Sequence, residues 1–298
     1  MAHLSWLEAG TVGLLQGVSE LFPVSSLGHA VLLPAVVGGS WARDLNVRAP
    51  ESPYLAFIVG LHVATAIALI VYFWRDWVRI VRGLITSIAR REIRTADQRL
   101  AWMLVLATIP VGLVGLVAEH AFRTTLSRPV PTALFLAVNG LVLLGIERAR
   151  PTEPGEYVDE RESGPKSDER VARLSFSRAV AIGSAQILAL APGISRSGIT
   201  TSAGLGAGLD REDAARFSFL LATPVILAAG VLKIGDLTGP LGNGIRGQVI
   251  LGSVLSGVGA YLSVRFLTRY LANRSLRPFG VYCIVAAAAC LAWFAIRH

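Results

Sequence analysis

The chain has 298 residues, of which 53% are hydrophobic and only 16% are charged. Its mean hydropathy is +0.57, and soluble domains carry about 25% charged residues, so composition excludes an ordinary soluble protein. The net charge of +8 does not indicate nucleic-acid binding. The arginines cluster in short segments at the ends of apolar runs, as orientation in a membrane requires.

The chain starts with an apolar stretch that polar residues interrupt. Residues 9–42 contain one formal charge, Glu20, inside QGVSELFPVSSLGH. No basic region precedes this stretch, so we do not expect a cleavable signal peptide. Pro, Gly and hydroxyl side chains beside a lone charge predict a helix break, which membranes tolerate only where it lines a cavity. Because an intramembrane charge costs roughly 2.5–3.5 kcal/mol, Glu20 is a candidate functional residue.

Six further stretches carry no formal charge and come close to the ~17–25 residues that cross a bilayer. They are 54–74, 100–118, 130–146, 217–232, 247–264 and 278–296. The sequence therefore predicts an all-α polytopic membrane protein. Cys283 and Cys290 lack partners at metal-ligand spacing, and we expect them to be small core residues. We expect His62, inside the first span, to pack against a neighbouring helix rather than to act in catalysis.

Connecting segments rich in Lys and Arg alternate with poor ones along the six spans. The rich segments are 75–99, 147–173 and 265–277, with seven, six and four, and the poor ones are 39–53, 119–129 and 236–246, with two, two and one. By the positive-inside rule, the rich segments are cytoplasmic and the poor ones external.

The polar segment 151–173 contains Pro and Gly and predicts a flexible cytoplasmic linker. It separates a first repeat, 1–150, from a second, 174–298. Each repeat starts with a broken stretch, predicted as the re-entrant helix pair 5–42 or 174–210, and continues with three spans. Because each repeat has an odd number of spans, the second repeat begins on the opposite side of the membrane from the first. The two re-entrant pairs are therefore expected to enter from opposite sides and to meet near the bilayer midplane. This arrangement is the inverted-topology repeat found in many transporters.

Identical residues relate the two broken stretches at an offset of 170. The pairs are Gly13 and Gly183, Gln16 and Gln186, Ser25 and Ser195, Gly28 and Gly198, and Gly38 and Gly208. Because they surround the two charged breaks, these identities favour an internal repeat.

In the second broken stretch, residues 179–209, the one formal charge is Arg196, inside APGISRSGIT. Pro192 and Gly193 end a helix, and the apolar run that follows predicts a new helix start near Ser197. A helix start offers free N–H donors, and Arg196 adds a planar fork suited to phosphate oxygens. We therefore expect a phosphate or pyrophosphate ligand. The alternative is that Arg196 extends to the membrane surface and the serines only cap helices.

The first motif offers complementary chemistry. Gln16 and Glu20 share one helix face, and Ser26 and His29 follow the proline that ends this helix. A carboxylate, an imidazole and hydroxyl groups within ten residues can supply a nucleophile and a base. The alternative is a structural ion pair between Glu20 and Arg196, which would leave the hydroxyls and His29 unexplained.

These motifs resemble the undecaprenyl-pyrophosphate phosphatase family of bacterial membranes, known also for bacitracin resistance. The resemblance covers nearly the whole chain and rests on QGVSE, FPVSSLGH, PGISRSGIT and FSFLLATP. It implies six spans and two re-entrant helix pairs in the bacterial cytoplasmic membrane. It also implies hydrolysis of a long polyprenyl pyrophosphate to the monophosphate, the carrier lipid recycled for peptidoglycan synthesis, at a site open to the external face.

The resemblance makes Glu20, Ser26 and Arg196 the core of the site and places His29 beside them, and we predict a catalytic role for all four. It assigns substrate binding to a polar set around them: Gln16, Ser25, Ser195, Ser197, Gly198 and Thr200. Many members carry Glu at the position of Gln16, so a role for a first carboxylate does not carry over. Glu20 and phosphate oxygens could share Mg²⁺ or Ca²⁺, which prefer oxygen ligands, but the sequence has no multi-carboxylate cluster to hold a metal without substrate.

Two mechanisms stay open at this stage. Ser26 attacks the terminal phosphorus with help from His29 or Glu20, or water positioned by Glu20 attacks directly. A transporter or flippase of the phosphorylated lipid is the alternative function, because it would use the same fold and the same Arg196. Such a carrier would not need Ser26 and His29, and a purely structural protein would need neither charged break.

The sequence also excludes another class of lipid phosphatase and limits the expected partners. Lipid phosphatases of the vanadium-peroxidase-like type need a Lys-x₆-Arg-Pro element, and neither Lys166 nor Lys233 starts one. The expected partners are the lipid substrate and membrane lipids, and not nucleic acid. The sequence is compatible with a homodimer but does not indicate one.

Overall fold

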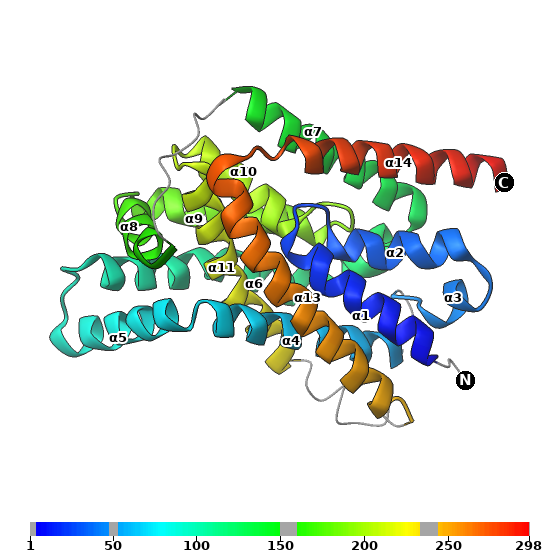
Figure 1. The fold of residues 1–298 in the computed structure, drawn as a ribbon, viewed down its shortest axis with the longest axis horizontal. Helices are drawn as coiled ribbons and strands as arrows, with labels where there is room; N and C mark the ends of the chain where they lie inside the picture. The colour runs from blue at the N-terminus through cyan, green and yellow to red at the C-terminus, as the bar shows by residue number, and fades with distance from the viewer. Residues whose placement is uncertain (1–3, 48–52, 150–159, 233–243, 298) are drawn as a thin grey trace.

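A computed structural model describes residues 4–47, 53–149, 160–232 and 244–297 (Figure 1). Over these residues the chain is helical and contains no β-strand. The helices in chain order are α1 (Trp6–Leu21), α2 (Ser26–Val37), α3 (Gly39–Asp44), α4 (Pro53–Tyr72), α5 (Trp74–Arg90), α6 (Ala96–Leu126), α7 (Pro129–Ala149), α8 (Glu160–Ala172), α9 (Phe176–Ser184), the 3₁₀ helix η1 (Ala185–Leu190), α10 (Arg196–Gly206), α11 (Arg211–Leu232), α13 (Arg246–Asn273) and α14 (Arg277–Arg297).

Five of the six predicted spans fall within α6, α7, α11, α13 and α14, and the first, 54–74, corresponds to α4 but runs past its end at Tyr72 to the first residue of α5. Among the described helices, five are long and apolar enough to cross a membrane, and the bent pair of α4 and α5 could provide a sixth. Large apolar side chains such as Leu116, Val117 and Ile296 stay exposed on these helices, where lipid would cover them. The prediction of an all-α polytopic membrane protein is confirmed.

Segment 75–99 is more than a connection, because most of it forms helix α5. This helix bends by 87° from α4 at a short break. Its exposed apolar residues recur with helical spacing, and they are Trp74, Val78, Val81, Ile85 and Ile88. Ile80, Gly83 and Ser87 are buried on the opposite side of the helix. An exposed apolar stripe next to arginines is typical of a helix that lies along the membrane interface.

The predicted linker 151–173 is described only from Glu160 onward, and residues 151–159 lie outside the described residues. The part that is described is not flexible chain but helix α8. Buried Asp168 on α8 accepts hydrogen bonds from Arg216 at 3.0 and 3.2 Å and from Arg79 at 2.6 Å. Ion pairs to α5 and α11 therefore hold most of this polar helix, and only its last turn, with Val171 and Ala172, joins the apolar core. This explains why the segment has no apolar periodicity.

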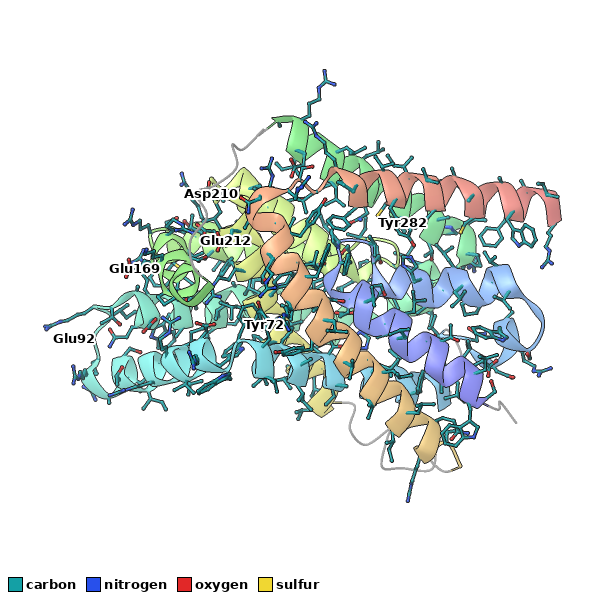
Figure 2. The ribbon with its side chains drawn as sticks, viewed as in Figure 1. Tyr72, Glu92, Glu169, Asp210, Glu212 and Tyr282 are labelled. Carbon is teal, nitrogen blue, oxygen red and sulfur yellow. The ribbon has the colours of Figure 1, made fainter. Side chains whose placement is uncertain are left out.

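The charge-rich connections gather at one end of the helix bundle. Glu92 follows α5, Glu169 belongs to α8, and Asp210 and Glu212 stand at the start of α11; all four lie at the left end of the view in Figure 2. Helices α5 and α8, which belong to two of the segments that the charge count assigns to one side of the membrane, thus lie at the same end of the molecule as the start of α11.

Glycines allow three pairs of helices to approach closely. Helix α1 packs along α13, where a Cβ atom at Gly13 would lie 2.6 Å from the backbone of Gly252. Helix α9 packs along α6, where a Cβ atom at Gly183 would overlap the carbonyl group of Ala107. Gly13 and Gly183, which match at the offset of 170, therefore occupy equivalent close crossings.

The third close pair is α7 and α14, which lie side by side (Figure 1). A Cβ atom at Gly140 would lie 2.7 Å from the carbonyl oxygen of Gly280, and one at Gly280 would lie 3.0 Å from the carbonyl oxygen of Gly140. The contact is thus reciprocal, with each glycine facing the backbone of the other.

Candidate active site

The first break separates α1 from α2. Pro23 cannot continue the hydrogen-bond ladder of α1, and Ser25 caps α2 by accepting a hydrogen bond from the backbone N–H of Gly28 at 3.1 Å. Ser25 has a φ of 69°, a left-handed backbone that is rare for residues other than glycine. Such a conformation costs on the order of 1–3 kcal/mol and persists only where the surroundings hold it.

The second break separates η1 from α10 and uses the same type of cap. Gly193 has a φ of 107°, which favours glycine. Ser195 caps α10 by accepting a hydrogen bond from the backbone N–H of Gly198 at 3.1 Å. The identities Ser25 with Ser195 and Gly28 with Gly198 therefore correspond to equivalent helix starts.

The two breaks are in direct contact. The hydroxyl of Ser25 also accepts a hydrogen bond from the backbone N–H of Gly193 at 3.2 Å. In the opposite direction, the hydroxyl of Ser197 donates to the carbonyl oxygen of Phe22 at 3.2 Å. The structure thus brings the two predicted motifs together in one place.

Glu20 is the centre of the polar cluster at this junction, and it is 7% exposed. Its Oε2 accepts hydrogen bonds from Ser26 Oγ at 2.5 Å and from Gln16 Nε2 at 2.9 Å. Its Oε1 accepts from Arg196 Nη2 at 2.7 Å. One carboxylate therefore links the candidate nucleophile of the first motif to the arginine of the second.

His62 belongs to the same cluster. It packs against a neighbouring helix, as expected, but against the polar face of α1. Its Nε2 lies 3.2 Å from Gln16 Nε2 and 3.5 Å from Glu20 Oε2, and its Nδ1 lies 2.9 Å from the carbonyl oxygen of Ile58. Because a carbonyl oxygen only accepts, Nδ1 carries the proton of the neutral ring, and Nε2 accepts from Gln16. The sequence feature that could have indicated this place in the site is an imidazole inside a span without formal charge.

Asn139, in the middle of α7, is the second residue that sequence reasoning missed. Its side chain reaches both breaks: it donates to the carbonyl oxygen of Pro23 at 3.0 Å and accepts from the backbone N–H of Ser195 at 2.9 Å. The signal was again a lone polar side chain in an apolar span.

Several donors of the second motif are buried without a hydrogen-bond partner among the described residues. They include Nη1 of Arg196 and the hydroxyl of Thr200, one turn further along α10. Buried polar groups are nearly always paired, so each exception needs an explanation. An anion that accepts hydrogen bonds from these groups would satisfy them, and α10 begins here with its N-terminus.

His29 has different neighbours from the other candidate catalytic residues. Its Nδ1 lies 2.8 Å from the carbonyl oxygen of Ser25, and its Nε2 lies 2.7 Å from the hydroxyl of Tyr282. The two rings stack with centroids 5.8 Å apart, and Figure 2 shows Tyr282 on α14. In the neutral ring, Nδ1 carries the proton and Nε2 accepts from Tyr282.

The residues present do not form a metal site. In the described part of the chain, no three His, Cys, Asp or Glu side chains gather as metal ligands would. Glu20, the proposed ligand, already accepts hydrogen bonds from Gln16, Ser26 and Arg196. Three donors, one of them cationic, surround the carboxylate where a bound cation would need acceptors, so no step is assigned to Mg²⁺ or Ca²⁺.

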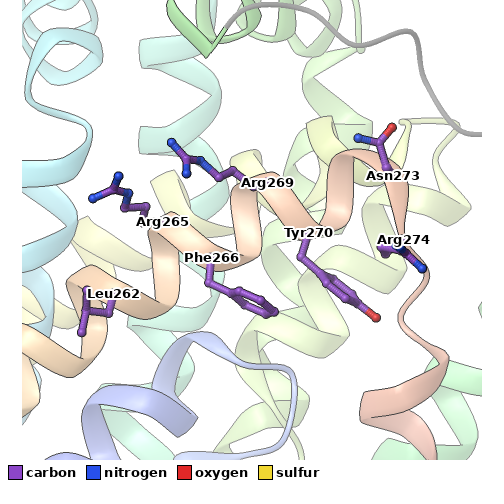
Figure 3. A pocket seen from close by; sticks show the side chains of 7 residues that line it. All are labelled: Leu262, Arg265, Phe266, Arg269, Tyr270, Asn273 and Arg274. Carbon is purple, nitrogen blue, oxygen red and sulfur yellow. The ribbon is translucent and has the colours of Figure 1, made fainter.

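An open pocket of about 620 Å³ lies on α13 beside this junction (Figure 3). It is lined by Leu262, Arg265, Phe266, Arg269, Tyr270, Asn273 and Arg274. Phe266 also stacks on Phe22 of the first break, with ring centroids 5.9 Å apart. Glu20, Ser26 and Arg196 do not line the pocket, so it neighbours the junction but does not contain the polar cluster.

Fold and site together define the class: a polytopic membrane protein in which two helix breaks meet at a buried carboxylate that bonds a serine and an arginine. The chain belongs to the family of the bacitracin resistance protein BacA, whose model matches residues 9–289. It is similar to the undecaprenyl-diphosphatase of Mycolicibacterium paratuberculosis, with 62% identity over 303 residues and 99% of each chain covered.

Two further relatives also match the chain over nearly its whole length. The undecaprenyl-diphosphatase of Mycobacterium avium is also 62% identical over 303 residues, with 99% of each chain covered. Undecaprenyl-diphosphatase 1 of Frankia casuarinae is 47% identical over 370 residues, covering 99% of this chain and 100% of the relative.

Proposed function

We propose that this protein hydrolyses undecaprenyl pyrophosphate to undecaprenyl monophosphate and inorganic phosphate, returning the carrier lipid to cell-wall synthesis. Relatives named for this hydrolysis match the chain over its whole length. The structural observation that carries the proposal is that the two terminal nitrogens of Arg196 differ in their partners. One of its terminal nitrogens holds Glu20, which in turn holds Ser26, while the other is buried and unpaired.

The geometry supports Ser26 as the nucleophile. Arg196 and the hydroxyl of Thr200 bind the terminal phosphate and stabilise the charge that develops on its oxygens. Ser26 attacks the terminal phosphorus, and its proton passes to Glu20 as the bond to the bridging oxygen breaks. The polyprenyl monophosphate leaves, and water then hydrolyses the phosphoserine. In this scheme Glu20, and not His29, takes the proton of Ser26, because the ring nitrogens of His29 bond the carbonyl oxygen of Ser25 and the hydroxyl of Tyr282.

Direct attack by water that Glu20 positions is the competing route. The hydrogen bond of 2.5 Å between Ser26 and Glu20 favours the covalent route, because it gives the hydroxyl a proton acceptor in place. A transporter would need the phosphate donors but not this pair, and nothing in the fold or among the relatives favours that alternative.

The proposed architecture is an inverted repeat of residues 1–150 and 174–298. Three observations support it: the equivalent caps at Ser25 and Ser195, the equivalent close crossings at Gly13 and Gly183, and the reciprocal contact of α7 with α14. A reciprocal contact is what a two-fold relation between halves produces. In the membrane, the pairs 5–42 and 174–210 would be re-entrant and meet near the midplane.

The proposed location is the bacterial cytoplasmic membrane, with the site open to the external face. The charge alternation would place the Arg-rich segments 75–99, 147–173 and 265–277 in the cytoplasm. Sedimentation of the detergent-solubilised protein would test the homodimer with which the sequence is compatible.

The test of function is phosphate release from a long polyprenyl pyrophosphate by the purified protein in detergent. We expect Ser26→Ala and Arg196→Ala each to lower kcat by at least about 10²–10³-fold. Arg211→Ala is the matched control, because Arg211 forms a similarly buried ion pair with Glu147, away from the junction. It should cost stability but leave the turnover of the folded protein intact.

Two further outcomes decide between the alternatives. If the wild type releases no phosphate but binds the lipid through Arg196, the protein is a carrier and not a hydrolase. If it turns over, mass spectrometry of an acid-quenched reaction should find phosphate on Ser26, and its consistent absence would favour direct attack by water.

A further inference from the structure

Asn139 is a buried polar residue with no place in the mechanism above. Its side chain is 2% exposed, and it is the only polar residue of α7 between Thr132 and Glu147. Because a polar side chain inside an apolar span is costly, such residues usually have a specific role.

The contacts of Asn139 join the two motifs through a third element. Its Nδ2 donates to the carbonyl oxygen of Pro23, three residues before Ser26, and its Oδ1 accepts from the N–H of Ser195, directly before Arg196. A shift at either end of this bridge would move the nucleophile relative to the phosphate-binding arginine.

Only an amide side chain suits this position. The carbonyl of Pro23 and the N–H of Ser195 lie in the breaks, outside the helices, and each would cost about 1–3 kcal/mol if buried without a partner. Asparagine donates to one and accepts from the other at the same time. A carboxylate would lose the donor, and an aliphatic side chain would lose both functions.

We propose that Asn139 is a positioning residue that sets the distance between Ser26 and Arg196 by bridging the two breaks. This inference rests on the proposed hydrolysis, but it concerns a residue whose side chain bonds Pro23, Ser195 and Cys283 and none of the proposed catalytic side chains. The direct hydrogen bonds between the motifs, from Gly193 to Ser25 and from Ser197 to Phe22, fix other points of the junction.

The experiment compares Asn139→Asp with Asn139→Leu, both in the full chain in detergent. A protonated carboxyl group donates and accepts like the amide, whereas its ionised form only accepts. The activity of Asn139→Asp relative to the wild type should therefore rise as the pH falls from about 8 to about 5. Asn139→Leu should show kcat lowered by about 10²-fold at every pH, with a small change in KM.

One titratable group contacts Asn139 directly: Cys283 on α14, with its sulfur 3.4 Å from Nδ2. The other helices packed against α7 carry Arg196, on α10, and His29, on α2. These groups are common to all variants and cancel in this ratio. The control is Ser87→Ala, which removes a buried hydroxyl bonded to Trp102 far from the junction. It should change thermal stability and not the ratio of kcat values.

The possible outcomes separate the two proposals. An Asn139→Asp ratio independent of pH, or losses that only track the folded fraction as in Ser87→Ala, would overturn the positioning role while the wild type still hydrolyses the substrate. A wild type without turnover would instead overturn the proposed function.

Discussion

The replacement Glu20→Gln tests the centre of the site with almost no change in shape. Glu20 accepts from Ser26 and Gln16 on one oxygen and from Arg196 on the other. A glutamine has one oxygen and one NH₂ group, so in either orientation its nitrogen faces a donor. Every arrangement of the new side chain therefore loses at least one hydrogen bond and the charge that strengthens the rest.

The expected loss follows from these contacts. A hydrogen bond to a charged group contributes about 1.5–3 kcal/mol. A loss of about 2–4 kcal/mol corresponds to roughly 30- to 1,000-fold in rate. Removing the proton acceptor of Ser26 costs about 10²–10⁴-fold by itself. The two effects act through one carboxylate and overlap, so we expect kcat/KM to fall by about 10³-fold.

The assay is steady-state phosphate release, with melting in detergent measured on the same samples. Glu147→Gln is the matched control: Glu147 is also buried and accepts from Arg211 and from the backbone of Leu276, away from the junction. If Glu20→Gln kept more than about a third of the wild-type kcat/KM, the carboxylate would be neither base nor positioner, since either role requires at least a tenfold loss.

Three further predictions address other parts of the molecule. His62→Ala removes the acceptor that orients Gln16 and should lower kcat/KM by about tenfold with little change in melting temperature; an unchanged rate would make the contact incidental. Gly17→Ala places a Cβ against the backbone of α13 and should cost about 1–3 kcal/mol of stability, measured as detergent melting, whereas Gly112→Ala, with open space around it, should not. A spin label at Ile85→Cys on α5 should be shielded from a water-soluble relaxation agent and one at Arg82→Cys exposed to it; equal exposure would contradict an interfacial helix.

Much of the fold could be predicted because its signals are local. Uncharged runs mark the spans, and the lone charges Glu20 and Arg196 mark the two breaks that the structure brings together. Helix α5 could also have been predicted, because the spacing of its apolar residues is helical. This segment was considered only for its arginines, to orient the spans. Helix α8 could not be predicted, because ion pairs with residues distant in sequence hold it and no periodic pattern indicates such pairs.

The missed site residues have a common physical reason. His62 and Asn139 each stand alone among apolar residues of a span, and their partners come from helices that cross them at a distance in sequence. A lone polar residue indicates that a partner exists but does not identify it. The catalytic role of His29 stays a prediction: its ring nitrogens face the carbonyl oxygen of Ser25 and the hydroxyl of Tyr282, and the sequence did not indicate the contact with Tyr282.

The hydrogen bond between Ser25 and Gly193 also bears on how the protein is made. The two residues are 168 positions apart, and a ribosome adds about 5–20 residues per second, so the first waits roughly 8–34 seconds for the second. During that interval the strained backbone of Ser25 lacks the contact that helps to hold it. Glu20 lacks its partner Arg196 for the same interval. In the proposed mechanism, catalysis therefore starts only when synthesis has passed the second motif.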